Sequence, residues 1–158
     1  MTDMPTSNPY NTATANAWIR DHKPDENARF RPGYHLAAPV GWLNDPNGLV
    51  HVNGEYHAFY QFHPYSSEWG PMHWGHAVSP DMVHWRHMPV ALAPDSHWDE
   101  GGCYSGSAVE DHGRLVLMYT GHTDTAETQN IAVSTDGTTS PRLTGQPRHS
   151  RPRPATTT

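Results

Sequence analysis

The segment Trp42-Leu43-Asn44-Asp45-Pro46-Asn47-Gly48 combines a carboxylate, a rigid turn and an aromatic ring within seven residues. Pro46 has a fixed φ and disfavours helical geometry in the residue before it, so we expect Asp45 to be extended. Asn47 and Gly48 tolerate positive φ, which suits a turn. The carboxylate of Asp45 is therefore expected to be held in place by its neighbours.

The residues after this segment have the pattern of a hairpin. Apolar and aromatic side chains occur over residues 49–52 and 55–61, and Asn53-Gly54 separates the two runs. An Asn-Gly pair in this position is typical of a two-residue turn between antiparallel strands. We therefore expect Asp45 at the mouth of a strand, at the entrance to a sheet.

An Asp-Pro-Asn-Gly turn needs no chemical role, so structure alone would explain Asp45. The side chains that follow favour a sugar site, because sugars bind to flat apolar faces and to planar hydrogen-bonding groups. Such side chains are Gln61, His63, Trp69, His73, Trp74 and His76.

Five motifs in this order resemble those of glycoside hydrolase family 32, which contains the invertases, sucrose-6-phosphate hydrolases and other β-fructofuranosidases. The motifs are Trp42-Leu43-Asn44-Asp45-Pro46-Asn47-Gly48, Phe59-Tyr60-Gln61-Phe62-His63-Pro64, Trp74-Gly75-His76-Ala77-Val78-Ser79, Val83-His84-Trp85 and Tyr104-Ser105-Gly106-Ser107-Ala108. The resemblance extends over residues 30–137.

This resemblance implies a glycosidase that cleaves the terminal fructosyl unit of sucrose or related β-fructosides with retention of configuration. Retention uses two carboxyl groups about 5–5.5 Å apart, a nucleophile and an acid. Asp45 matches the family's nucleophile, which forms a covalent fructosyl intermediate. The positions that contact the fructosyl unit in the family correspond to Asn44, Gln61, Trp69, Tyr104 and Ser105, and Trp42 would help to wall the pocket.

Two later motifs of the family are missing from these 158 residues. They are Arg-Asp-Pro, whose aspartate holds sugar hydroxyls in the transition state, and Glu-Cys, whose glutamate is the general acid/base. Glu68 and Glu100 lie in Gly- or Pro-rich loops that look exposed, whereas a general acid needs an apolar wall. General acid catalysis contributes about 10²–10⁴-fold, so we expect this chain to be truncated and inactive alone.

Two alternatives to a plain β-fructofuranosidase stay open. A sucrose-6-phosphate hydrolase would act on the phosphorylated sugar, but no basic cluster near the motifs marks a phosphate pocket. A non-catalytic sugar-binding fragment would keep the nucleophile half of the site. The sequence does not distinguish hydrolysis from fructosyl transfer, and it leaves the oligomeric state open.

Composition narrows the remaining classes. The chain has 15 Pro, 13 Gly and only 35% hydrophobic residues, which is typical of many short strands and turns. A net charge of −6 argues against nucleic acid as a partner. Residues 1–10 lack the features of a secretory signal, no apolar run reaches membrane length, and Cys103 is the single cysteine. We therefore expect a cytoplasmic protein without membrane contact.

A metal site is a second class to consider, because the chain has 13 histidines. His73 and His76 are three residues apart, as are His84 and His87. On a strand, residues at this spacing project to opposite faces and cannot chelate together. We expect no metal and no cofactor, and the predicted partner is a small sugar.

The chain divides into three predicted parts: residues 1–29 with a short helix over 11–22, residues 30–137 as the all-β part, and residues 138–158 as a disordered or aberrant tail. Further strands are expected over 72–78, 83–88, 104–110, 114–120 and 129–134, with residues 89–99 as a connection. Antiparallel meanders of this kind suit a propeller or a sandwich. The family resemblance implies a partial five-bladed β-propeller, with strands for about two blades.

Overall fold

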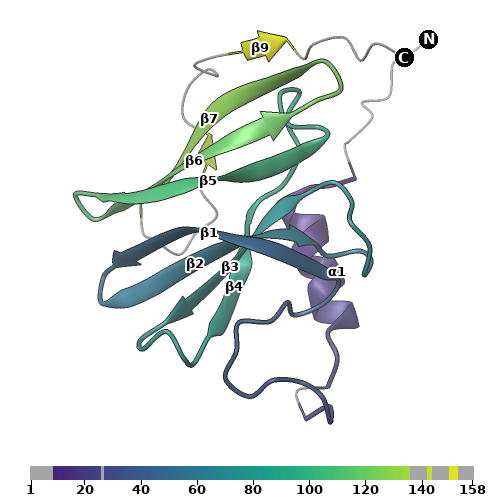
Figure 1. Ribbon diagram of the computed structural model, residues 1–158, viewed down its shortest axis with the longest axis vertical. Coiled ribbons are helices and arrows are strands. Elements are labelled where there is room, and N and C mark those ends of the chain that lie inside the picture. The colour runs from purple at the N-terminus through teal and green to yellow at the C-terminus, as the bar shows by residue number, and fades with distance from the viewer. Residues whose placement is uncertain (1–8, 26, 136–141, 144–149, 153–158) are drawn as a thin grey trace.

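The computed structural model describes residues 9–25, 27–135, 142–143 and 150–152 (Figure 1). One helix precedes nine strands. The elements are α1 (Thr12–His22), β1 (Trp42–Val52), β2 (Glu55–His63), β3 (His73–Ser79), β4 (Arg86–Leu92), β5 (Gly102–Asp111), β6 (Arg114–His122), β7 (Ala126–Ser134), β8 (Arg142–Leu143) and β9 (Ser150–Pro152). Within the described ranges, no helix is both long and apolar enough to span a membrane.

The strands form two antiparallel sheets, with the orders β1-β2-β3-β4 and β5-β6-β7-β8, and β9 also pairs with β7. Figure 1 shows the first strands of the two sheets, β1 and β5, lying next to each other where the sheets meet. Two neighbouring meanders in contact through their first strands have the arrangement of two blades of a β-propeller. The predicted all-β, partial-propeller fold is confirmed.

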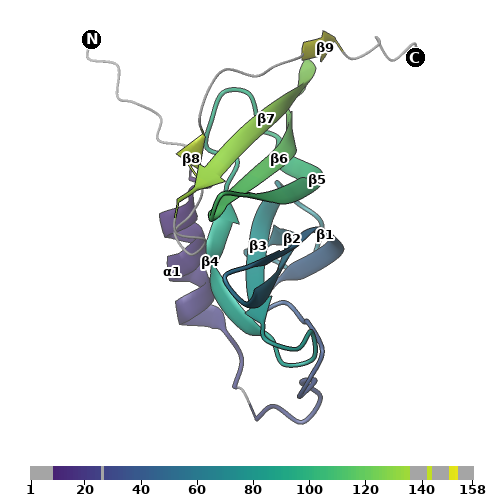
Figure 2. The same cartoon turned by 90° about the vertical axis from the view of Figure 1, so that its left-hand side faces the viewer.

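Helix α1 packs on β4, the last strand of the first sheet (Figure 2). Asn11 caps the helix, since its side chain accepts a hydrogen bond from the Thr14 amide at 2.9 Å and the Thr14 hydroxyl accepts one from the Asn11 amide at 3.1 Å. Asn16 then accepts a hydrogen bond from the amide of Val90 on β4 at 2.9 Å. The predicted helix is confirmed, and this bond fixes it to the sheet.

The core lies on both faces of the first sheet because side chains alternate along a strand. Phe59 on β2 and Trp74 on β3 join Leu117 of β6 between the two sheets. Tyr60, one residue after Phe59, packs on the opposite face with Ala15 of α1. The first sheet is thus buried between the second sheet and the helix.

Two hairpin turns have positive φ at both central residues. Asn53 and Gly54 have φ values of 52° and 84°, and His112 and Gly113 have values of 51° and 81°. Positive φ at both central residues is the requirement of a type I′ turn. The predicted Asn-Gly turn between β1 and β2 is confirmed, and β5 and β6 are joined by a turn of the same type.

The boundaries of β4 differ from those expected. Residues 83–85 lie outside the strand, because the Asp81 carboxylate accepts hydrogen bonds from the amides of Val83 at 2.9 Å and His84 at 2.8 Å. The strand continues through Pro89 to Leu92, where the sequence predicted a connection. A shift in the register with β3 lies in this stretch, and proline is tolerated at such irregularities of an edge strand.

The segment 138–158 was expected to be disordered, and it contains two described strands. Leu143 pairs with Ala132, and Ser150 pairs with Thr128, so β8 and β9 both add to the edge of β7. Backbone pairing to an exposed edge needs little side-chain burial, which explains why composition did not predict it. The other residues of this segment lie outside the described ones, and for them disorder stays a prediction.

Candidate active site

Asp45 lies at a β-bulge in β1. Asn44 pairs with Gln61 and Pro46 pairs with Tyr60, so Asp45 has no partner residue on β2. Its φ is +31° and its side chain is exposed. The side-chain amide of Asn47 donates a hydrogen bond to the Asp45 backbone carbonyl oxygen at 3.1 Å, which stabilises this backbone conformation.

This geometry corrects two expectations. Asp45 is inside a strand that begins at Trp42, and its backbone is on the left-handed side, although a residue before proline was expected to be extended. The bulge overrides the preference before proline, and aspartate is among the residues that tolerate positive φ. Such strained positions cluster at functional sites, and a bulge aims its side chain away from the regular sheet.

Trp42 and Asn44 form one unit beside Asp45. The indole Nε1 of Trp42 donates to Oδ1 of Asn44 at 2.6 Å. This bond fixes which end of the Asn44 side chain is the acceptor. The NH₂ group at the other end is a hydrogen-bond donor, which suits a sugar hydroxyl. The side chains of both residues are partly exposed.

Gln61 and Trp74 connect the site to the second sheet. The Gln61 amide donates to the carbonyl oxygen of Cys103 at 3.0 Å, and the Trp74 indole donates to the next carbonyl, that of Tyr104, at 3.1 Å. The Cys103 amide donates to the Met72 carbonyl at 2.8 Å. These three bonds fix the beginning of β5 against the first sheet. Gln61, which is a predicted sugar contact, is only 4% exposed. Its hydrogen bond to Cys103 therefore gives it a structural role as well.

Ser105 lies at a second bulge, in β5. Tyr104 pairs with Thr120 and Gly106 pairs with Tyr119, which leaves Ser105 without a partner residue and exposed. Asp45 and Ser105 are therefore both bulged residues, one on each of the two strands that meet at the contact between the sheets. A bulge aims a side chain away from the regular sheet, so both residues present polar groups at this junction.

Gly48 explains how β1 can approach β5. Its φ is +58°, and a Cβ there would lie 3.0 Å from the Phe59 ring, 3.3 Å from the Trp74 ring and 3.4 Å from the Ala108 Cβ. A side chain at this position would be strained and would push the two strands apart. The glycine that ends the Asp-Pro-Asn-Gly motif, which lies within β1, thus permits the junction between the sheets.

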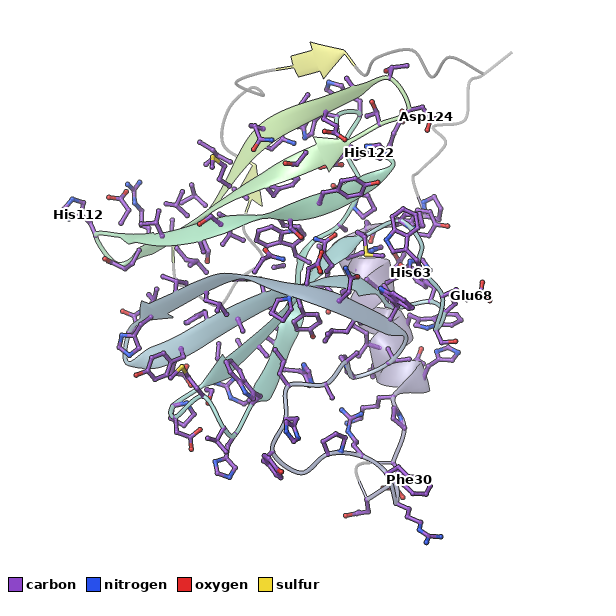
Figure 3. The ribbon with its side chains drawn as sticks, in the orientation of Figure 1. Phe30, His63, Glu68, His112, His122 and Asp124 are labelled. Atoms are coloured by element: carbon purple, nitrogen blue, oxygen red, sulfur yellow. The ribbon has the colours of Figure 1, made fainter. Side chains whose placement is uncertain are left out.

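Trp69 belongs to the loop between β2 and β3. Its side chain is 57% exposed, and Glu68 beside it is also exposed. Figure 3 shows Glu68, His63 and His122 on one side of the two sheets, with His112 at the opposite end of the second sheet. His63 pairs with Trp42, so this loop leaves the sheet on the side where β1 begins. The predicted sugar contact of Trp69 stays a prediction.

Asp99 is a buried carboxyl group that sequence reasoning missed. It is 1% exposed, its Oδ2 accepts a hydrogen bond from the Tyr119 hydroxyl at 2.7 Å, and its Oδ1 accepts one from the Ser96 amide at 2.8 Å. Burial raises the pKa of Asp99 to about 6. Its carbonyl accepts from the Gly102 amide at 2.7 Å, so it holds the start of β5. A lone aspartate in a predicted connection gave no sequence signal.

Tyr104 and His122 form a second feature that the sequence did not reveal. Their rings stack with centroids 4.5 Å apart and an interplanar angle of 12°. Glu127 lies 3.6 Å from Nδ1 of His122. The stack places an imidazole next to the predicted sugar-contacting tyrosine, at the end of β6.

His73 and His76, which are three residues apart in the sequence, have different neighbours in the structure. Nδ1 of His73 is 3.0 Å from the Pro71 carbonyl, whereas Nε2 of His76 is 3.0 Å from Nδ1 of His57. Across the described part of the chain, no three side chains of His, Cys, Asp or Glu come together as metal ligands.

Two adjacent blades that meet through their first strands place the chain in the class of β-propeller proteins, and the bulged polar residues at their junction form the candidate site. A family model described as "Glycosyl hydrolases family 32 N-terminal domain" matches residues 35–155. The chain belongs to glycosyl hydrolase family 32.

Known relatives agree with this assignment. The chain is 54% identical over 134 residues to a sucrose-6-phosphate hydrolase of Escherichia coli, covering 79% of this chain and 28% of that protein. It is 64% identical over 91 residues to the raffinose invertase of Escherichia coli, covering 58% of this chain and 19% of that protein.

A solved structure shows the same fold. The β-fructofuranosidase of Bombyx mori matches with a TM-score of 0.75 and 44% identity, over 85% of this chain and 29% of that one. The chain therefore spans less than a third of the length of each of these proteins.

Proposed function

We propose that these residues form the nucleophile-bearing part of a retaining β-fructofuranosidase, which cleaves the terminal fructosyl unit of sucrose or a related β-fructoside. The observation that carries the proposal is the bulge that presents an exposed Asp45 carboxylate beside the Asn44 amide. In this proposal Asp45 attacks the anomeric carbon and forms a fructosyl ester. Asn44, Gln61, Trp69, Tyr104 and Ser105 contact the sugar, and Trp42 walls the pocket.

We also propose that the 158 residues do not turn over sucrose by themselves. Glu68 and Glu100 are exposed on loops, which supports the expectation that neither serves as the acid. Asp99 has a pKa raised by burial to about 6, but both of its oxygens are already bonded inside the protein. Without a protonated carboxyl group beside the leaving oxygen, cleavage of an unactivated glycoside is slow.

A substrate whose leaving group needs no proton tests the nucleophile alone. With fructosyl fluoride, the Asp45 carboxylate forms a C–O bond to the anomeric carbon while the C–F bond breaks and fluoride departs with its electron pair. We expect intact-mass spectrometry of the purified chain to show the gain of one fructosyl unit, located on Asp45 by peptide mapping. Asp45→Asn removes the nucleophile and should abolish the gain.

Asp111→Asn is the matched control, because Asp111 lies at the far β5–β6 turn, where it forms an ion pair with Arg114. Labelling that persists in Asp45→Asn would disprove the assigned nucleophile. Sucrose hydrolysis by the 158-residue chain that depends on Asp45 would disprove the proposed lack of turnover.

A sucrose-6-phosphate hydrolase is the second candidate, because the Escherichia coli relative of 54% identity carries that name. The two candidates differ in whether a 6-phosphate improves binding. Protection of Asp45 from fructosyl fluoride labelling by sucrose and by sucrose 6-phosphate separates them, because this readout reports only on ligands bound at Asp45. A cytoplasmic location is a further proposal from the sequence, which fractionation of the native host would test.

A further inference from the structure

A cavity of about 570 Å³ lies between the end of α1, residues 31–39 and the start of β4, and is called here the α1–β4 cavity. It is separate from the site at Asp45. Pairing across the four strands of the first sheet places Arg86 on β4 level with Val50 on β1. In the same way, Leu92 on β4 is level with Asn44 on β1, beside Asp45. Three strand steps of about 4.8 Å and six residues of about 3.3 Å put the two sites about 14 Å apart across the sheet and about 20 Å along it.

The lining of the α1–β4 cavity carries positive charge. Lys23, Arg31 and Arg86 line it, and none of the described lining residues is Asp or Glu. Arg86 forms an ion pair with Glu55, with Nη2 3.1 Å from Oε1, so part of its charge is balanced. Arg31 donates to the Ala38 carbonyl at 3.4 Å, and among the described residues it forms no ion pair. The guanidinium of Arg31 is therefore the main candidate for an anion contact.

The walls of the α1–β4 cavity are held by hydrogen bonds. Nδ1 of His87 on β4 is 3.2 Å from the Tyr60 hydroxyl on β2, and the same imidazole bonds to the backbone of Ala37. Burial and then the positive charge of Arg31 lower the pKa of His87, so Arg31 acts at close range on this ring. His87 thus joins residues 31–39 to the sheet, and Arg31 and His87 line the same cavity.

Aromatic rings provide the other half of the cavity's chemistry. Trp85 lines the cavity and packs against the core cluster that contains Tyr60. Tyr34 also lines it, with 60% of its surface exposed. Figure 3 shows that the neighbouring Phe30 lies far from His63 and Glu68, so this segment is away from the candidate active site. A flat ring and a guanidinium in one cavity suit a ligand with a ring and an anionic group.

We propose that the α1–β4 cavity is a second ligand site that binds a phosphate monoester carried on a ring, with the phosphate on Arg31 and Lys23 and the ring against Trp85 and Tyr34. Sugar phosphates and nucleoside monophosphates share this chemistry. The proposal does not rest on the activity assigned to Asp45.

Isothermal calorimetry on the purified full chain tests the proposal with glucose 6-phosphate, adenosine 5′-monophosphate, glucose and inorganic phosphate. We expect saturable binding of at least one of the two esters, with glucose and inorganic phosphate at least about tenfold weaker because each lacks one half of the contact. Whichever ester binds more tightly identifies the ring.

Variants locate the binding. Arg31→Gln should weaken it at least about tenfold, and Tyr34→Ala should weaken it several-fold. Lys23→Gln is a second charge variant on an exposed residue, in case Arg31→Gln does not fold by circular dichroism. Arg114→Gln, a distant exposed arginine, and Asp45→Asn should leave binding unchanged. Loss of binding in Asp45→Asn, full retention in both Arg31→Gln and Lys23→Gln, equal binding of inorganic phosphate, or no binding of either ester would each overturn the proposal.

Discussion

The two sheets bury their residues in different ways. Every residue of β3 in the first sheet is buried, because the second sheet covers one face and α1 contacts the other side of the sheet. In the second sheet, β6 alternates between buried Leu117 and exposed Met118, and Val109 on β5 is 56% exposed. One sheet is a covered middle layer, and the other has one face open.

The buried polar groups of the two sheets also differ. The first sheet contains buried histidines, and burial lowers the pKa of His73 to about 4 and of His76 to about 3. The second sheet is held at its start by Asp99, whose pKa burial raises to about 6. Burial favours the neutral form of each of these groups. Acid charges the histidines, which destabilises the fold, whereas it neutralises Asp99, which stabilises the fold. The free energy of unfolding measured against pH should therefore contain opposite contributions from the two sheets.

The largest expected effect follows from the difference in burial. Trp74→Ala removes a fully buried ring between the sheets and also the donor to the Tyr104 carbonyl, which should cost about 3–5 kcal/mol of unfolding free energy. Met118→Ala on the open face of the second sheet should change it by about 0.5 kcal/mol or less. Urea unfolding followed by circular dichroism measures both values. Similar costs for the two variants would mean that the open face of the second sheet is covered in solution.

Acid should destabilise the protein through the first sheet. The folded-state pKa values of His73 and His76 lie below the unfolded value of 6.5, so their contribution is complete above pH 6.5 and is lost as pH falls toward 4 and 3. Between pH 7 and pH 5, each should cost on the order of 1–2 kcal/mol. Urea unfolding at a series of pH values measures this slope.

His76→Gln removes one of these groups and should flatten the slope, although it also lowers stability at pH 7 because the contact with His57 is lost. His112→Gln is the matched control, since the side chain of His112 is 95% exposed. A slope that is the same in His76→Gln and the wild type would contradict the assignment to the buried histidines.

Much of the fold was predictable from local signals. Asn-Gly and His-Gly turns fix the hairpins β1–β2 and β5–β6, and the Asn11 cap fixes the start of α1, because each signal acts within a few residues. The limits of β4 were not predictable, because Pro89 is a poor strand residue whose place depends on a bulge against β3.

Motif order named the residues of the candidate site, but it did not predict their geometry. Motif order brought Asn44, Gln61 and Tyr104 together in the prediction, and the structure places them at the junction of the sheets. The positive φ of Asp45 was missed because a rule for the residue before proline does not include the effect of a bulge. Asp99 was missed because its burial depends on Tyr119, which is distant in sequence.

The smallest expected effect concerns the second sheet and opposes the acid response of the first. The folded-state pKa of Asp99, about 6, lies above its unfolded value of 3.8, so its contribution is present at low pH and is lost as pH rises through 6. Acidification from pH 7 to pH 5 should therefore return about 1 kcal/mol, which offsets part of the loss from the histidines. Asp99→Asn cannot titrate, so its unfolding free energy should fall more steeply with acid than that of the wild type, by about 1 kcal/mol over the same range. Asp111→Asn, at the exposed turn of the same sheet, serves as the control. A slope for Asp99→Asn equal to that of the wild type would mean that Asp99 stays ionised in the folded protein, and the start of β5 would then be held by a buried charge instead of a neutral carboxyl group.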